Sequence, residues 1–248
     1  MQQGAKSIMI GMAGILAGAA GAVLATGAAS GAGESVGGTD RASIEKIVRE
    51  YILANPEILP EAMRNLERKE ASAKVKAQGN KVEQTFGTAW EGAADGDVTL
   101  VEFYDYNCGY CRQALPDVDR LLAEDKNLRV VYRELPILNA ESEQAARTAL
   151  AVAKLGDHPK FHRALYAGGR VTPDSISAAI KSTGLDEKQV RTIAASQEVT
   201  NEIRSNLAIQ QSLGLSGTPS WVIGDQLISG AVGYDELKAA IAEARKGG

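Results

Sequence analysis

The sequence predicts an α/β protein whose mixed sheet carries helices on both sides. Two apolar, strand-like runs at residues 99–104 and 128–135 flank a helical segment at about 109–124, and this β-α-β order implies that the two strands are parallel. Further strand signals at residues 220–223 and 226–229 are separated by the turn residues Gly224 and Asp225. They predict a closing antiparallel hairpin.

The helical elements follow from apolar spacing and from punctuation by Pro and Gly. A long helical stretch covers residues 139–213, with starts expected at Thr172-Pro173 and Asp186 and a stop at Gly184. A last amphipathic helix covers residues 234–245. Pro116 lies inside the helix after the first strand and is expected to kink it.

Composition excludes some classes of partner. The chain has 248 residues and a net charge of −4, so it carries no basic excess of the kind that binds nucleic acid or an anionic membrane. Of its residues, 44% are hydrophobic but only 5% are aromatic. We therefore expect an aliphatic, alanine-rich core and no nucleic-acid partner.

Residues 1–38 differ from the rest and are excluded from the predicted fold. A single charge at Lys6 precedes an uncharged Ala- and Gly-rich run at 8–30, whose last residues are small. This pattern is typical of an export signal with a cleavage region, although ~20 apolar residues can also anchor a chain in a bilayer. We expect cleavage, with an uncleaved anchor and a flexible low-complexity tail as the alternatives. With either a cleaved signal or an anchor, the protein is expected outside the cytoplasm, where disulfides persist.

Residues 41–78 predict a small helical module. Apolar residues at i, i+3, i+4, i+7 and i+8 give the first helix one apolar face. Asn55 and Pro56 should end it and start a second helix, as N-cap and first helical residue, and the chain beyond Leu66 is charged and expected to be solvated. Because so small a unit cannot bury its own apolar surface, the module must pack on the main domain or on copies of itself. The two apolar faces comprise Ile44, Ile47, Val48, Tyr51 and Ile52, then Ile58, Leu59, Ala62, Met63 and Leu66.

The two cysteines of the chain stand as Cys108-Gly109-Tyr110-Cys111, where the first strand passes into the helix. Cysteines one helical turn apart can form a disulfide. Cys108, at the helix start, faces free N–H groups and the positive end of the helix dipole, which favour a thiolate. We therefore predict that Cys108 is the attacking sulfur and Cys111 the less exposed, resolving thiol.

Three other uses of the cysteine pair remain open. An inert structural disulfide would close a very small loop and stabilise little. A zinc site with His158 and His162 would need a gap between ligand pairs far longer than the ~12–15 residues of a zinc finger, so these histidines are expected at the surface or half buried. A reduced pair could also hold a soft ion such as Cu(I). We predict no cofactor and no dedicated metal site.

Several features occur in this order along the chain: a strand, a C-x-x-C helix start, Pro116, a helical block, and Thr218-Pro219 before a late strand. Together they resemble the DsbA family of thioredoxin-fold proteins. Residues 102–111, together with the helical pair and its Asn55-Pro56 corner, are similar to the branch that holds Com1-like proteins and the suppressor of copper sensitivity protein C (ScsC). The resemblance implies a thioredoxin-like domain at 85–246 with a DsbA-type helical insertion at about 139–213. It also implies that residues 41–78 form an oligomerisation module, for which we expect a trimer.

The resemblance assigns further site residues. Pro219 matches the family's cis-proline, which faces the cysteines and binds the substrate backbone, and Thr218 matches the threonine of the dimeric isomerases. Glu102 matches the acidic residue buried beneath the pair, where a raised pKa suits proton transfer; from sequence alone a solvated or salt-bridged Glu102 is an equal alternative. Gly109-Tyr110 replaces the Pro-His of the DsbA oxidase, and Tyr110 either meets substrates or packs on the helix.

The expected function is therefore that of an exported, periplasmic thiol–disulfide oxidoreductase acting on misoxidised protein cysteines, as an isomerase or reductase. Work in the reduced state requires an electron donor, for which we expect a membrane thiol reductase. Self-association would place several catalytic domains around one client and raise the effective concentration of the second site. The alternatives are a DsbA-like dithiol oxidase and a periplasmic copper-binding or chaperone protein linked to copper tolerance.

Overall fold

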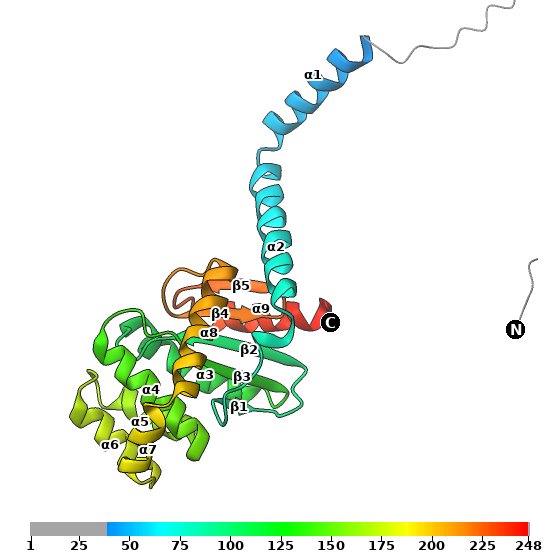
Figure 1. The fold of residues 1–248 in the computed structure, drawn as a ribbon. Coiled ribbons are helices and arrows are strands. Elements are labelled where there is room, and N and C mark those ends of the chain that lie inside the picture. Colours follow the sequence, from blue (N-terminus) through cyan, green and yellow to red (C-terminus); the bar gives the residue numbers. More distant parts are fainter. Residues whose placement is uncertain (1–38, 248) are drawn as a thin grey trace, which may run out of the picture. The chain divides into compact units, whose positions relative to one another are not determined.

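The computed structural model describes residues 39–247, which divide into two units between Ala54 and Asn55 (Figure 1). The predicted export signal or anchor at residues 1–38 lies outside the described residues. No helix within residues 39–247 has both the length and the apolar character that a membrane crossing requires.

The described part of the first unit is helix α1, Thr39–Ala54. Its apolar side chains recur with helical spacing, as the sequence predicts, and Ile44, Ile47 and Val48 are all exposed within this chain. The helix ends before Asn55-Pro56, because proline has no N–H to donate and disfavours helical backbone in the residue before it.

The second unit begins with helix α2, Ile58–Gln78, which ends at the last residue of the predicted helical module. Asn55 and Pro56 precede the helix in a tight turn, in which the N–H groups of Ile58 and Leu59 bond the carbonyls of Asn55 and Pro56 at 3.2 Å. The expected N-cap is therefore wrong, and Glu57 occupies that position. Although the segment after Leu66 is charged, Val75 packs against the core and fixes the last turns of α2 on the domain.

The five strands of the second unit form one mixed sheet in the order β1-β3-β2-β4-β5. Strands β2 and β3 are parallel, whereas the pairs β1–β3, β2–β4 and β4–β5 are antiparallel. This confirms the predicted parallel pair and closing hairpin, and adds the short edge strand β1. The strands are β1 (Trp90–Gly92), β2 (Val98–Tyr104), β3 (Leu128–Glu134), β4 (Ser220–Ile223) and β5 (Gln226–Ser229).

The helical insertion consists of five helices between β3 and β4. Thr172 caps α6 in a capping box with Ser175, Gly184 ends α6 at φ 78°, and the side chain of Asp186 caps α7. These three boundaries confirm the prediction; the breaks near Gly156, Gly168 and Ser196 were not predicted. The helices are α4 (Ala140–Leu155), α5 (His158–Ala167), α6 (Pro173–Thr183), α7 (Glu187–Ala194) and α8 (Gln197–Leu213).

Side chains of β2 point alternately into two layers of the core, one on each face of the sheet. Leu100 and Tyr104 pack with side chains of helices α3 (Gly109–Glu124), α5 and α9 (Tyr234–Gly247), whereas Val101 and Phe103 pack with side chains of α8. Because side chains alternate along a strand, β2 is buried on both sides. Its carboxyl end, where the cysteine pair begins, is therefore held from both layers.

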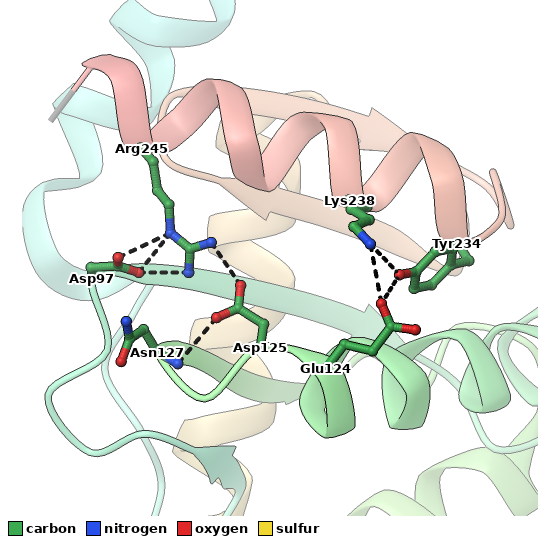
Figure 2. A network of polar contacts seen from close by, with 7 residues as sticks. All are labelled: Asp97, Glu124, Asp125, Asn127, Tyr234, Lys238 and Arg245. Carbon is green, nitrogen blue, oxygen red and sulfur yellow. Dashed lines mark hydrogen bonds and ion pairs between the residues drawn. The ribbon is translucent and has the colours of Figure 1, made fainter.

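A polar network fastens α9 to the far end of α3 (Figure 2). Arg245 contacts both Asp97 and Asp125 at 2.7 Å, and the hydroxyl of Tyr234 donates to Glu124. The Tyr234 hydrogen bond, with Arg120 and Lys238, lowers the pKa of the Glu124 carboxyl to about 2. These contacts fix the carboxyl end of the helix whose amino end carries the cysteines.

Candidate functional site

The cysteine pair lies where β2 passes into α3. Cys108 is the N-cap residue of α3 in extended conformation, with φ −78° and ψ 116°, and Cys111 lies in the first turn. The exposed fraction is 7% for Cys108 and 1% for Cys111. Cys111 is thus the less exposed of the two sulfurs, which is the relative exposure that the sequence predicts.

The Cys108 sulfur lies among hydrogen-bond donors. The pKa of its thiol is lowered to about 5, first by a hydrogen bond from the Cys111 thiol and then by the Thr218 side chain and the N–H groups of Tyr110 and Cys111. Burial opposes the shift but does not cancel it. A thiol with this pKa is largely ionised at neutral pH, which is the state that attacks disulfides.

Cys111 has the opposite character. Burial raises the pKa of its thiol well above the ordinary value, and the hydrogen bond to Cys108 and the charge of Glu102 add to the increase. The backbone N–H of Asp105 donates to its sulfur and opposes this trend. The inner sulfur therefore keeps its proton and shares it with the thiolate of Cys108.

Thr218, which precedes Pro219, contacts the outer sulfur. The Cys108 Sγ lies 3.2 Å from the Thr218 carbonyl oxygen, and the Thr218–Pro219 peptide bond is cis, the conformation that the resemblance implies. The Pro219 carbonyl accepts a bond from the Gly230 N–H at 2.8 Å. The loop before β4 and the start of α3 thus form one site from segments far apart in the sequence.

Glu102 lies on β2 beneath the pair and is 2% exposed. Burial, followed by the charge of Cys108, raises the pKa of its carboxyl to about 8. Among the residues that the structure describes, its carboxyl forms no hydrogen bond or ion pair. Glu102 is therefore buried rather than solvated or salt-bridged, and a buried carboxyl can hold a proton at neutral pH.

The two residues between the cysteines border open space. Tyr110 is 66% exposed, so its ring does not pack on the domain. A side chain in place of Gly109 would meet no atom within 4 Å. This rim of the site is accessible to a large partner.

The two histidines are buried, which corrects the expectation that they lie at the surface or half buried. His158 and His162, on α5, form hydrogen bonds with the hydroxyls of Tyr104 and Tyr106 at 3.1 and 3.2 Å. Burial lowers the pKa of His158 to about 3 and that of His162 well below its usual value. Both rings are neutral members of a buried aromatic cluster. In the described part of the chain, no group of three or more His, Cys, Asp or Glu side chains is arranged to hold a metal ion.

Asp105 is a site residue that the sequence analysis missed. It is 1% exposed and lies between β2 and the cysteines, in contact with both sulfur-bearing residues through its backbone. The available signal was an acidic residue three positions before the first cysteine at the end of an apolar strand. Its partners Ile137, Leu138 and Ser142 lie more than thirty residues away and could not be identified from that signal.

Solved structures have the same fold. The chain is 39% identical to a thioredoxin-like oxidoreductase from Silicibacter pomeroyi, with a TM-score of 0.65 over 68% of this chain and 98% of that one. It is 28% identical to Proteus mirabilis ScsC in a transitional conformation, with a TM-score of 0.61 over 86% and 99% of the two chains.

Curated relatives include much longer proteins. The chain is 29% identical over 159 residues to the Na(+)/H(+) antiporter NhaA 1 of Salinispora arenicola, covering 63% of this chain and 24% of that protein. It thus spans about a quarter of the length of the first curated relatives it matches.

Two family models match the chain in sequence order. The copper resistance protein ScsC N-terminal domain matches residues 40–73, and the DSBA-like thioredoxin domain matches residues 99–242. The second match covers more than half of the 248 residues. The chain therefore belongs to the DsbA-like thioredoxin family, with an ScsC-type N-terminal domain ahead of the thioredoxin-like domain.

Proposed function

We propose that this protein is an exported thiol–disulfide oxidoreductase that acts on protein cysteines through Cys108 and Cys111. The observation that carries the proposal is the unequal pair of sulfurs at the start of α3. One sulfur is held as a thiolate by converging donors, and the other is buried as a thiol. An inert disulfide or a simple buried thiol needs no such difference.

The reaction follows from this arrangement. The Cys108 thiolate attacks one sulfur of a client disulfide, forms a mixed disulfide and expels the other client sulfur as a thiolate. In isomerisation, a client thiolate then attacks and releases Cys108 unchanged. In reduction, Cys111 gives its proton to the ionised fraction of the buried Glu102 carboxyl and displaces the client sulfur. The client then gains two electrons and the enzyme ends as the Cys108–Cys111 disulfide.

We favour the isomerase or reductase direction for two reasons. The Gly109-Tyr110 pair lacks the histidine that stabilises the thiolate in the DsbA oxidase, and Thr218 resembles the residue of the dimeric isomerases. A membrane thiol reductase would then return electrons to the oxidised pair. The second candidate is a dithiol oxidase, and the pKa of about 5 at Cys108 favours it, because a stabilised thiolate makes the disulfide form a stronger oxidant.

The client would lie against the exposed rim of the site. Tyr110, Ile137 and Leu138 are 66%, 42% and 51% exposed, and the N–H groups of Ile137 and Leu138 bond Asp105 beside the cysteines. Apolar side chains of an unfolded client would be buried there while its backbone meets the Pro219 loop. This arrangement suits clients whose apolar segments are still unfolded.

We further propose that the N-terminal helices associate copies of the chain, with a trimer favoured. The apolar face of α1 is uncovered within this chain, and so are Leu59, Met63 and Leu66 on α2. Faces of this kind associate because burial removes apolar area from water. The proposed location is the periplasm, by export through residues 1–38.

One experiment separates the candidates: the equilibrium of the full chain with glutathione, on protein of known mass. A potential of about −120 mV in a monomer would favour the oxidase, and a potential of about −180 mV in an oligomer would favour the isomerase.

Serine variants test the use of the two sulfurs. The Cys111→Ser variant should accumulate a mixed disulfide with a client through Cys108. If the double variant Cys108→Ser/Cys111→Ser keeps its effect on clients, both enzymatic candidates fail and a chaperone remains. Copper binding that needs both sulfurs, without client exchange, would support the copper-binding alternative.

A further inference from the structure

We infer that Asp105 is a positioning residue for the thiol chemistry: it fixes the loop that orients both sulfurs and ties that loop to the segment between β3 and α4. The inference rests on the proposed use of Cys108 and Cys111. It adds a residue that neither sulfur pattern nor family resemblance assigned.

The side chain of Asp105 holds together the loop before α3, the segment between β3 and α4, and the start of α4. Its Oδ1 accepts from the Asn107 N–H at 2.8 Å and the Ser142 hydroxyl at 2.6 Å. Its Oδ2 accepts from the N–H groups of Ile137 and Leu138 at 3.0 and 3.1 Å. Four donors therefore converge on two oxygens that are removed from water. This is the bonding capacity of a carboxylate, and no other side chain of this size has it.

The backbone of the same residue reaches both cysteines. The Asp105 N–H donates to the Cys111 sulfur, and its carbonyl accepts from the Cys108 N–H at 3.0 Å and from the Tyr166 hydroxyl at 3.2 Å. Asp105 thus fixes the position of the Cys111 sulfur. It also fixes the turn that makes Cys108 the N-cap of α3. A shift of this turn would misalign the N–H groups of Tyr110 and Cys111 with the outer sulfur.

Asn107 extends the connection to the helical insertion. Its amide donates to Asn139 at 2.9 Å and to Ser142 at 3.3 Å, and its Oδ1 accepts from the Val171 N–H at 3.4 Å. The loop that carries Cys108 is therefore hydrogen-bonded to the start of α4 and to the segment before α6. Asp105 is the central residue of this network because it bonds the loop, the β3–α4 segment and α4 at once.

Two effects of removing the Asp105 charge oppose each other, which makes the test decisive. Loss of a nearby negative charge alone would favour the Cys108 thiolate and lower its pKa. Loss of the turn would weaken the donors that hold the thiolate and raise that pKa. Those donors are among the main causes of the shift in the Cys108 pKa, and the charge of Asp105 is not. We therefore expect the positioning effect to exceed the charge effect.

The experiment is a pH titration of thiolate absorbance in the reduced full chain, comparing wild type with Asp105→Asn. The amide turns two N–H donors toward groups that are themselves donors, so two of the four bonds are lost. We expect the midpoint for Cys108 to rise by about one pH unit, equivalent to part of one charge-assisted bond. The glutathione equilibrium should move about tenfold toward the disulfide in the same variant.

Two further variants keep the test falsifiable. Ser142→Ala removes one bond to Asp105 and should raise the midpoint by less, which decides the question if Asp105→Asn does not fold. Asn206→Ala removes buried bonds to Arg133 and to the Glu134 carbonyl and should lower stability without moving the midpoint.

An unchanged or lower midpoint in folded Asp105→Asn overturns the inference. So does an unchanged midpoint in Ser142→Ala where Asp105→Asn does not fold, or an equal rise in Asn206→Ala. A wild-type protein whose Cys108 forms no mixed disulfide with clients contradicts the proposed function instead. The midpoints are measured without any client, so the two failures are distinguishable.

Discussion

The Sγ of Cys108 lies 3.2 Å from the carbonyl oxygen of Thr218, although 110 residues separate them in the chain. The contact joins the amino end of α3 to the loop that leads into β4. When Cys108 is protonated, its thiol donates to this carbonyl; when it is ionised, the Thr218 side chain helps hold the charge. A client chain lying along the Pro219 loop would meet the outer sulfur at this contact.

The first prediction concerns the reactivity of the two sulfurs. In the reduced protein, the rate of Cys108 alkylation by iodoacetamide should rise with a midpoint near pH 5, since the thiolate is the reacting form. Cys111 should stay unmodified through neutral pH in the folded protein because it is buried and protonated. Peptide mapping after a short pulse at pH 6.5 separates the two, and equal labelling would contradict the assignment.

The second prediction concerns Thr218. Replacement by Val keeps the backbone carbonyl but removes the hydroxyl that helps hold the Cys108 thiolate. The pKa of Cys108 should therefore rise by about half a unit to one unit, the effect of one weakened hydrogen bond to a charged group. The measurement is the same alkylation profile, with Thr218→Ser as the control that restores a hydroxyl. A fall in the midpoint for Thr218→Val would contradict it.

Much of the fold was predictable because strong local signals specify it. The apolar run ending at Tyr104 and the cysteine pair set the boundary between β2 and α3, and Gly184 and Asp186 marked a helix end and start. Strand β1 has three residues, too few for an alternating pattern, and was missed. The contact of Val75 with the core was not predicted, because it is one apolar residue within a charged segment.

The site was predictable only where chemistry and local geometry coincide. Cysteines one turn apart at a helix start are visible in the sequence, and the roles of the two sulfurs follow from helix electrostatics. The roles of Asp105 and His162 depend on partners more than thirty residues away, such as Leu138 for Asp105 and Tyr106 for His162. Short polar residues of this kind look the same in sequence whether they are solvated or buried.

The third prediction concerns client binding at the rim. Replacing both Ile137 and Leu138 by Ser should raise the KM for a misoxidised protein client several-fold, since about 1 kcal/mol of apolar contact would be lost. The value of kcat should change little because the bonds to Asp105 come from the backbone of these residues. Unchanged KM would show that clients do not use this surface, and an unchanged Cys108 alkylation profile is the internal control.

The fourth prediction concerns assembly. Ile47→Glu places a charge on the apolar face of α1, where Ile47 is 64% exposed within this chain. If this face associates copies of the chain, the variant should sediment as a monomer at concentrations where wild type is a trimer, because a buried, unpaired charge is costly. Arg49→Ala, on the same helix but outside the apolar face, is the matched control. A wild-type monomer would contradict the proposed module.

The fifth prediction concerns Glu102 and the pH dependence of stability. The carboxyl has a pKa of about 8 when folded and an ordinary value of 4.5, so the folded state holds more protons than the unfolded state between these values. The free energy of unfolding therefore loses this contribution as pH rises from 4.5 to 8. Glu102→Gln has no proton to lose and removes that slope.

Denaturant unfolding of the reduced protein at pH 5 and pH 8 measures the effect. The stability of Glu102→Gln relative to wild type should increase with pH, by on the order of 4 kcal/mol over the full interval. Most other titrations cancel in this difference because both proteins share them. A difference independent of pH would mean that Glu102 ionises normally in the folded state. The same variant should slow release of a client from the mixed disulfide, because Cys111 loses the carboxyl whose ionised form accepts its proton. Attack by Cys108 should continue.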